Sequence, residues 1–154
     1  MMDELARLLG RERRLLELLL FKLVEGRHLL AASEARFLPS AVTEVERATD
    51  RVQEAELWRS MLIHDLARDL DMPEEALTMS ALAENSIEPF RTIFADHRRA
   101  FLDLAAEIEE VTRQNRCLAD VADGLATVGA RTNQAESARA TARITLPSLV
   151  DFLR

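Results

Sequence analysis

The chain has 154 residues, enough for one domain with a substantial core, and 48% of them are hydrophobic. Its formal net charge of −7 excludes a general nucleic-acid-binding protein, because binding to phosphates needs a basic face. A single cysteine, Cys117, excludes an internal disulfide and a cysteine-based zinc site. Few glycines and prolines, in a sequence rich in alanine, leucine, glutamate and arginine, indicate long helices.

The first helix is predicted over residues 3–32. One of its faces carries Leu9, Leu16, Leu19, Leu23 and Leu30. Gly26 lies on the same stripe, and we expect it to permit close approach of another helix, because glycine inside a helix is otherwise costly. Glu17 and Lys22 interrupt the leucine-rich stretch 15–24, which is therefore neither a signal segment nor a membrane span. We expect a cytoplasmic protein.

The second helix is predicted over residues 37–70. Its stripe alternates spacings of three and four through Leu38, Ala41, Val45, Ala48, Val52, Ala55, Arg59, Leu62 and Leu66. We expect the stem of Arg59 to pack while its guanidinium reaches solvent and a carboxylate such as Glu56. Residues 71–75 form a polar connector, and residues 77–83 are expected to form a short helix.

The third and longest helix is predicted from Phe90 to Leu125, with Ser86 as a possible N-cap. Its stripe is Phe90, Phe94, His97, Phe101, Leu104, Ile108, Val111, Asn115, Leu118, Ala122 and Leu125. This spacing averages about 3.5 residues, which is typical of a helix packed lengthwise against others. We interpret His97 as a hydrogen-bonded core histidine, and Asn115 as a polar seam residue that fixes register.

Three long helices with short connections predict an all-α fold. The expected architecture is an elongated antiparallel bundle of three long helices, with a short connecting helix between the second and third and a C-terminal tail. We predict a bundle domain at residues 1–128 and, at residues 129–154, a polar tail of net charge +2 that ends in a short apolar segment. That tail is a tethered arm, a disordered end or a segment docked on its own bundle.

No combination of residues supports an enzyme. Glu25 and His28 have the Glu-x-x-His spacing of di-iron bundles, but Met61 and Phe94 stand three residues before the other two histidines, so the second copy is missing. Cys117 has no histidine within a helical turn, and we expect a buried, inert thiol. We therefore predict no catalytic residue, no metal site and no cofactor.

Four stretches together carry a family resemblance. They are Leu18–Glu25, Glu44–Glu46, the connector 70–73 with 77–83 after it, and Leu104–Ile108 leading to Asn115–Leu118. Their order resembles FlgN-like flagellar export chaperones of actinobacterial type, over roughly residues 15–128. One departure is Thr112, where the family often has a second asparagine. The resemblance implies a cytoplasmic, non-enzymatic protein that escorts hook–filament junction proteins to the type III export apparatus.

The resemblance also implies a client site in the C-terminal part, from about Leu118 onward, where the amphipathic C-terminal helix of a hook-associated protein is bound and premature assembly prevented. A helical partner is held in such a groove by apolar anchors one turn apart. The candidate partner-binding residues are Asn115, Leu118, Ala122, Leu125, Val128, Leu146, Leu149, Val150, Phe152 and Leu153. The five tail residues could fill the same groove when no client is bound.

The sequence is also compatible with other functions and assemblies. A general helical adaptor or coiled-coil scaffold unrelated to motility is the alternative function. A homodimer without client would also bury long apolar stripes. We expect no nucleic-acid partner and no membrane insertion. The sequence does not identify the client.

Overall fold

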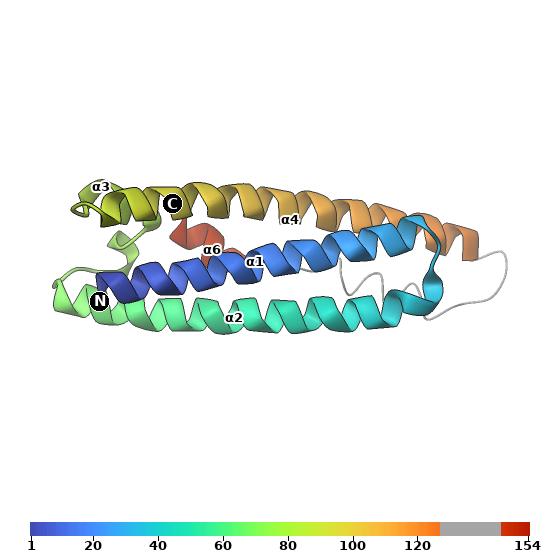
Figure 1. Cartoon of the computed structure of the whole chain (residues 1–154), viewed down its shortest axis with the longest axis horizontal. Helices are drawn as coiled ribbons and strands as arrows, with labels where there is room; N and C mark the ends of the chain where they lie inside the picture. Colours follow the sequence, from blue (N-terminus) through green and yellow to red (C-terminus); the bar gives the residue numbers. More distant parts are fainter. Residues whose placement is uncertain (127–145) are drawn as a thin grey trace. The chain divides into compact units, whose positions relative to one another are not determined.

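The computed structural model describes residues 1–126 and 146–154, with side chains described for residues 1–121 and 146–154 (Figure 1). The helices are α1 (Met2–Ala31), α2 (Leu38–Asp69), α3 (Met79–Asn85), α4 (Phe90–Ala126) and α6 (Pro147–Phe152), with 3₁₀ turns at Ala35–Phe37 and Glu74–Ala76. All regular structure in the described residues is helical, which confirms the predicted all-α class, with three long helices and a short one before the third.

The first two long helices end in left-handed residues. Ser33 follows α1 with φ 56°, and Asp71 follows α2 with φ 52°. After α1, the N–H of Glu34 donates to the carbonyl of Leu29 at 3.0 Å. This pattern is a Schellman cap, which satisfies the last carbonyls of a helix and turns the chain back on itself.

The start of α4 differs from the prediction. Ser86 caps the C-terminal end of α3, where its N–H donates to the carbonyl of Leu82, so its assignment as the N-cap of the long helix is wrong. Instead, Glu88 accepts from the hydroxyl of Thr92 at 2.9 Å and from its N–H at 3.4 Å. A carboxylate at this position also complements the positive end of the helix dipole.

The chain divides into two compact units. Among the described residues, unit 1 contains residues 1–16, 51–105 and 146–154, and unit 2 contains residues 17–50 and 106–126. The buried side chains of unit 1 include Leu5, Leu9, Leu16, Val52, Ala55, Ile63, Leu66, Leu77, Met79, Leu82, Phe94, Phe101 and Leu104. Those of unit 2 include Leu19, Leu23, Leu38, Val42, Val45, Ala48, Ile108, Val111 and Ala119. Each unit therefore has its own apolar core.

The buried faces follow the predicted stripes closely in α1 and α4. In α2 the stripe is shifted at two places, since Val42 and Ile63 are buried where Ala41 and Leu62 were expected. Polar pairs between helices are Glu12–Arg59 and Lys22–Glu44 from α1 to α2, and Arg13–Asp96 and Arg27–Gln114 from α1 to α4. As the residue number on α1 increases, the residue number of its partner decreases on α2 and increases on α4. Helix α2 is therefore antiparallel to α1, and α4 is parallel to it.

Candidate functional site

Each unit buries polar side chains among its apolar ones. The buried polar side chains of the described residues are Glu12 and Arg59 in unit 1, and Thr112 and Asn115 in unit 2. A buried polar group costs free energy unless it is hydrogen-bonded, so these positions are the first place to look for a role beyond packing.

Arg59 lies at the centre of the polar group in unit 1. Its side chain is only 2% exposed, and its Nη1 donates to Oε1 of the fully buried Glu12. The prediction that the guanidinium reaches solvent is therefore wrong, and its hydrogen-bonded carboxylate partner is Glu12 rather than Glu56. Glu56 lies close enough to interact electrostatically with Arg59. One guanidinium thus serves two carboxyl groups.

The two carboxyl groups are incompletely satisfied. Oε2 of Glu12 and Oε1 of Glu56 are buried without a hydrogen-bond partner. Burial raises the pKa of Glu12 to about 7, against the attraction of Arg59 and with a further rise from the charge of Glu56. Burial also raises the pKa of Glu56, against Arg59 and a hydrogen bond from the backbone of Leu149. Glu12 therefore takes up a proton near neutral pH.

Helix α6 covers this cluster. Nη2 of Arg59 donates to the hydroxyl of Ser148 at 3.1 Å, and its guanidinium carbon lies 4.6 Å from the ring centroid of Phe152. Leu149 and Leu153, one turn apart, are 0% and 3% exposed. Helix α6 thus packs two leucines into unit 1 and turns a hydroxyl and an aromatic ring toward Arg59.

Two further contacts hold the end of α6. Nε of Arg98, on α4, donates to the carbonyl of Leu153 at 3.2 Å, and the hydroxyl of Ser80, on α3, donates to the carbonyl of Arg154. We call the residues that receive α6 the α6 seat: Glu12, Glu56, Arg59, Ser80 and Arg98. The seat draws on four different helices.

The free energy that holds α6 is small. Burying its two leucines contributes about 3–6 kcal/mol. The cation–π contact adds about 1–2 kcal/mol, and the hydrogen bonds of Arg59, Arg98 and Ser80 add about 1 kcal/mol each. Fixing residues 147–154, which make these contacts, costs about 8–16 kcal/mol of conformational free energy. Gain and cost nearly cancel, so α6 is held only weakly in its seat.

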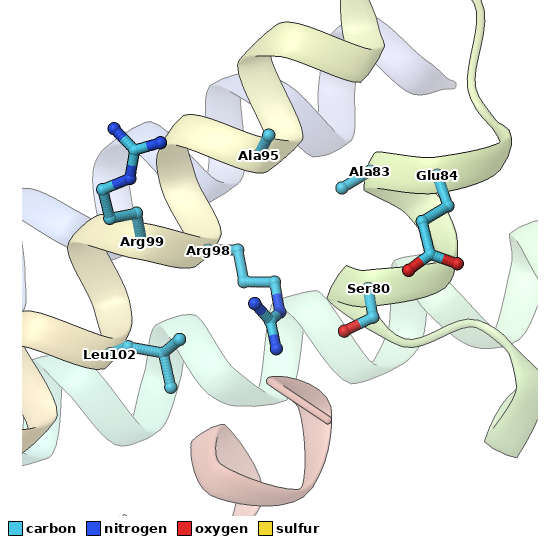
Figure 2. Close-up of a pocket in the computed structure, with 7 residues that line it drawn as sticks. All are labelled: Ser80, Ala83, Glu84, Ala95, Arg98, Arg99 and Leu102. Atoms are coloured by element: carbon cyan, nitrogen blue, oxygen red, sulfur yellow. The ribbon is translucent and has the colours of Figure 1, made fainter.

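A pocket of about 420 Å³ adjoins the seat. It is lined by Ser80, Ala83, Glu84, Ala95, Arg98, Arg99 and Leu102. Figure 2 shows Arg98 pointing from α4 toward α6, with Ser80 on α3 near its guanidinium. Leu102 at the pocket's edge is 43% exposed, so apolar surface continues outward from the seat.

The buried polar group of unit 2 is neutral. Asn115 is fully buried, and its Nδ2 donates to the carbonyl of Leu23 at 3.1 Å, which ties α4 to the backbone of α1. Its Oδ1 has no hydrogen-bond partner, nor does the buried hydroxyl of Thr112. A Cβ added at Gly26 would lie 4.0 Å from Nδ2 of Asn115, which is ordinary contact, so close approach does not require glycine there.

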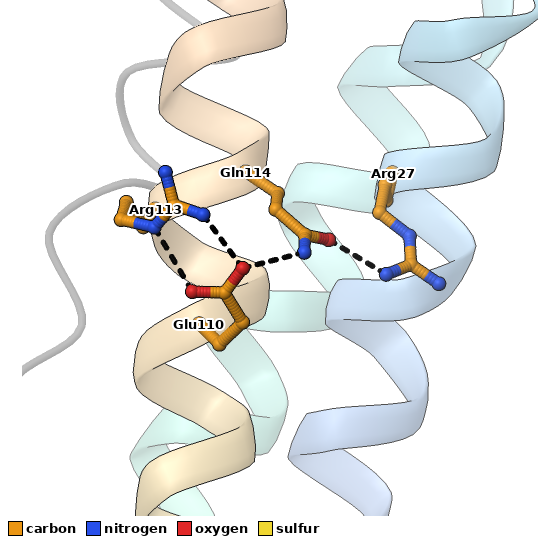
Figure 3. Close-up of polar contacts among 4 residues, drawn as sticks. All are labelled: Arg27, Glu110, Arg113 and Gln114. Atoms are coloured by element: carbon orange, nitrogen blue, oxygen red, sulfur yellow. Dashed lines mark hydrogen bonds and ion pairs between the residues drawn. The ribbon is translucent and has the colours of Figure 1, made fainter.

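A chain of surface hydrogen bonds links the same two helices. Arg113 donates to Glu110 at 2.9 and 2.6 Å, and Nε2 of Gln114 donates to the same carboxylate at 2.7 Å. Arg27 on α1 donates to Oε1 of Gln114 at 2.7 Å (Figure 3). These donors lower the pKa of Glu110 to about 2. Because Glu110 is exposed, the network adds little to stability but orients side chains.

The predicted partner-binding stretch of α4 has buried and exposed apolar positions. Asn115 and Ala119 are buried, Leu118 is half-buried, and Val121, which is not a predicted stripe position, is 62% exposed. Cys117 is also exposed, so the prediction of a buried thiol is wrong. The side chains of Ala122 and Leu125, within α4, and the whole of Val128 lie outside the described residues.

The predicted tail residues lie in unit 1. Leu149 and Leu153 are buried there, Leu146 and Phe152 are half-buried, and Val150 is 52% exposed. The expectation that the tail fills the groove around Leu118 is wrong, because α6 occupies the α6 seat and Leu118 belongs to unit 2. Two leucines one turn apart can pack into many apolar grooves. The polar contacts with Arg59 and Arg98 are what distinguish the α6 seat as the position of α6.

The histidines carry no site chemistry in the described residues. His97 is half-buried and stacks on Phe101 with ring centroids 6.0 Å apart, and its Nδ1 has no partner, so it is not the fully hydrogen-bonded histidine predicted. Burial lowers its pKa, and Arg13 lowers it further, which keeps the ring neutral. No three His, Cys, Asp or Glu side chains in residues 1–121 and 146–154 group so as to hold a metal ion.

Sequence reasoning missed Glu12. The buried positions of α1 run Leu5, Leu9, Glu12, Leu16, Leu19 and Leu23, with spacings of four and three throughout. A glutamate on that seam, together with an arginine on the seam of α2, is a signal for a buried ion pair. The pattern therefore contained the pair, although only Arg59 was singled out.

Comparison with known proteins gives a family. The family model described as FlgN protein matches residues 1–122. No curated protein and no solved structure matches the chain. No helix in residues 1–126 or 146–154 combines the length and apolar character of a membrane span. The matched residues include α1 to α3 and most of α4, which are more than half of the chain. The chain therefore belongs to the FlgN family, whose members act as flagellar export chaperones rather than as enzymes.

Proposed function

We propose that this protein binds the amphipathic C-terminal helix of flagellar hook-associated proteins, prevents their premature assembly and delivers them to the type III export apparatus. Family membership over residues 1–122 is the observation that carries the proposal. The proteins of a hook–filament junction assemble through their terminal helices, whose apolar stripes need a cover before assembly. A helical partner supplies that cover by burying the stripe in a groove.

We infer that the client lies along the end of α4. Support comes from Leu118, a half-buried position of the apolar stripe, and from the neighbouring Val121, an apolar side chain that is 62% exposed. The apolar positions Leu118, Ala122, Leu125 and Val128 continue the stripe in the sequence. A partner helix that covered them would extend the apolar core of unit 2.

We further propose that the protein works in the cytoplasm, where export clients are made, and that it meets components of the export apparatus there. A homodimer in the absence of client belongs to the same proposal, because a second copy could cover the same apolar positions. Both points concern partners, and both are tested by what co-purifies with the chain.

Co-purification with a hook-associated protein tests the proposal. We expect the intact client to co-purify with the chain, and a client without its C-terminal helix not to co-purify. Val121→Glu should weaken client binding at least about tenfold, because a charge on the apolar contact must be desolvated. Leu57→Glu on α2 is the matched control, since Leu57 is equally exposed at 62%.

Two results would count against this function. Binding that survives removal of the client's C-terminal helix would place recognition elsewhere on the client. Equal loss for Val121→Glu and Leu57→Glu would mean that the end of α4 is not the binding surface. Circular dichroism of both variants checks that neither change unfolds the bundle.

A further inference from the structure

The buried cluster of unit 1 has more hydrogen-bond acceptors than its occupant satisfies. Arg59 is shared between Glu12, Glu56 and Ser148, and one oxygen of each glutamate has no partner. Helix α6 brings only the hydroxyl of Ser148 and the ring of Phe152 to this guanidinium. A better occupant would donate to the two unpartnered oxygens and still accept from Arg59.

An amide side chain has both properties. The carbonyl oxygen of Asn or Gln accepts from a guanidinium, while its NH₂ group donates two hydrogen bonds. The side chain of Gln is also longer than that of Ser148, so it can extend further into the carboxylate cluster. A basic side chain would satisfy the oxygens but would stand against Arg59, and an acidic one would add to the unsatisfied negative charge.

The contacts of α6 show which apolar side chains an occupant of the seat needs. Leu149 and Leu153 are the two buried anchors of α6, one turn apart; Leu149 follows Ser148 and Leu153 follows Phe152, the two residues that contact Arg59. Because α6 has only six helical residues, it is marginal as a helix on its own and depends on these contacts. The neighbouring pocket shares Ser80 and Arg98 with the seat, and these two residues contact the chain just after α6, at Arg154 and Leu153.

We propose that the α6 seat is a second docking site, whose partner is an amphipathic helix with two leucines one turn apart and an Asn or Gln directly before the first. Helix α6 occupies the seat until such a partner displaces it. The site consists of residues of unit 1, whereas the proposed client surface consists of residues of unit 2. It does not depend on the flagellar client.

Peptide binding to the full chain tests this site. The probes are three fluorescent peptides with the sequence of residues 145–154: one unchanged, one with Ser148→Gln and one with Ser148→Ala. The receptor is the full chain with Leu149→Ala and Leu153→Ala, which releases α6, and the native chain is compared with it. A Phe152→Ala chain is a milder release should the double variant fail to fold.

We expect each peptide to bind the released chain at least about tenfold more tightly than the native chain, whose own α6 competes. On the released chain the Gln peptide should bind about tenfold more tightly than the unchanged one, as new hydrogen bonds to charged groups predict. The Ala peptide should be the weakest. Adding Glu12→Gln and Glu56→Gln to the released chain should remove the advantage of the Gln peptide.

Three results would overturn the proposal. Equal binding to native and released chains would show that the seat is not exchangeable. A Gln peptide no tighter than the Ala peptide would show that the unpartnered oxygens do not select the occupant. A native dimer that Leu149→Ala and Leu153→Ala convert to a monomer would assign the seat to α6 of a second copy. None of these assays contains a hook-associated client, so their outcome is separate from that of the client experiment.

Discussion

Units 1 and 2 use the same three long helices but bury different chemistry. In unit 1 the seam contains an ion pair, Glu12 with Arg59, and a further carboxyl group, Glu56. In unit 2 the seam contains one amide, Asn115, bonded to the backbone of α1. The ionic group is contacted by a further helix, α6, whereas the amide is bonded between two of the long helices, α1 and α4.

The difference teaches what each polar group contributes. The Nδ2 of Asn115 donates to the carbonyl of Leu23, which fixes the register of α4 against α1, although its Oδ1 has no partner. A buried ion pair recovers its desolvation cost only when all its oxygens are bonded, and here two are not. Both units therefore leave polar atoms unpartnered, but those of unit 1 belong to carboxyl groups beside α6, whereas those of unit 2 belong to the neutral side chains of Thr112 and Asn115.

The largest test of this contrast is Arg59→Ala. We expect the free energy of unfolding to fall by about 3–5 kcal/mol, because Glu12 and Glu56 would remain buried without a counter-charge. Replacing Glu12 and Arg59 together by Met should recover much of that loss, since an apolar pair needs no hydrogen bonds. Urea unfolding followed by circular dichroism measures both. A loss below about 1 kcal/mol for Arg59→Ala would mean that water reaches the cluster.

The pH dependence of stability should differ in sign between two glutamates. The pKa of Glu12 is raised from 4.5 to about 7, so its contribution is complete below about pH 4.5 and is lost as the pH rises through about 7. The pKa of Glu110 in unit 2 is lowered to about 2, so its contribution is present above about pH 4.5 and is lost as the pH falls toward 2.

Urea midpoints between about pH 5 and pH 8 isolate the first effect, because Glu110 stays ionised over that range. We expect the native chain to lose stability across it and Glu12→Gln to lose less. Glu110→Gln is the control, and its slope should match that of the native chain. A Glu12→Gln slope equal to the native one would assign the pH dependence to another group, with Glu56 as the next to test.

The bundle could be predicted because its signals are periodic. The stripe from Phe90 to Leu118 repeats every 3.5 residues, and each of its positions in the described side chains is buried or half-buried. For the same reason, the predicted helix boundaries lie within a few residues of those in the structure. Ser86 was misassigned because a serine can cap either end of a helix, and only Glu88 and its bond to Thr92 decide the case.

The α6 seat could not be predicted, because its parts are far apart in the sequence. Arg59 bonds to Glu12, 47 positions away, and to Ser148, 89 positions away. A stripe shows that a residue faces the seam but not which residue it meets there. Cys117 shows another limit, since it adjoins Leu118 in the sequence but lies about 200° around the helix from the buried Asn115, and it is exposed.

The smallest test uses one glycine in each unit. Gly10 lies inside α1 in unit 1, where an added Cβ would meet Cε1 of His97 at 3.8 Å, and Gly26 would meet Asn115 at 4.0 Å. Both are ordinary contacts, so Gly10→Ala and Gly26→Ala should each stabilise the fold by about 0.5–1 kcal/mol, by restricting the unfolded chain. Urea unfolding of each variant and of the pair should give additive gains, because the sites share no contact. If Gly26→Ala destabilised while Gly10→Ala stabilised, the seam at Asn115 would be tighter than the ion-pair seam, and the contrast between the units would rest on packing as well as on charge.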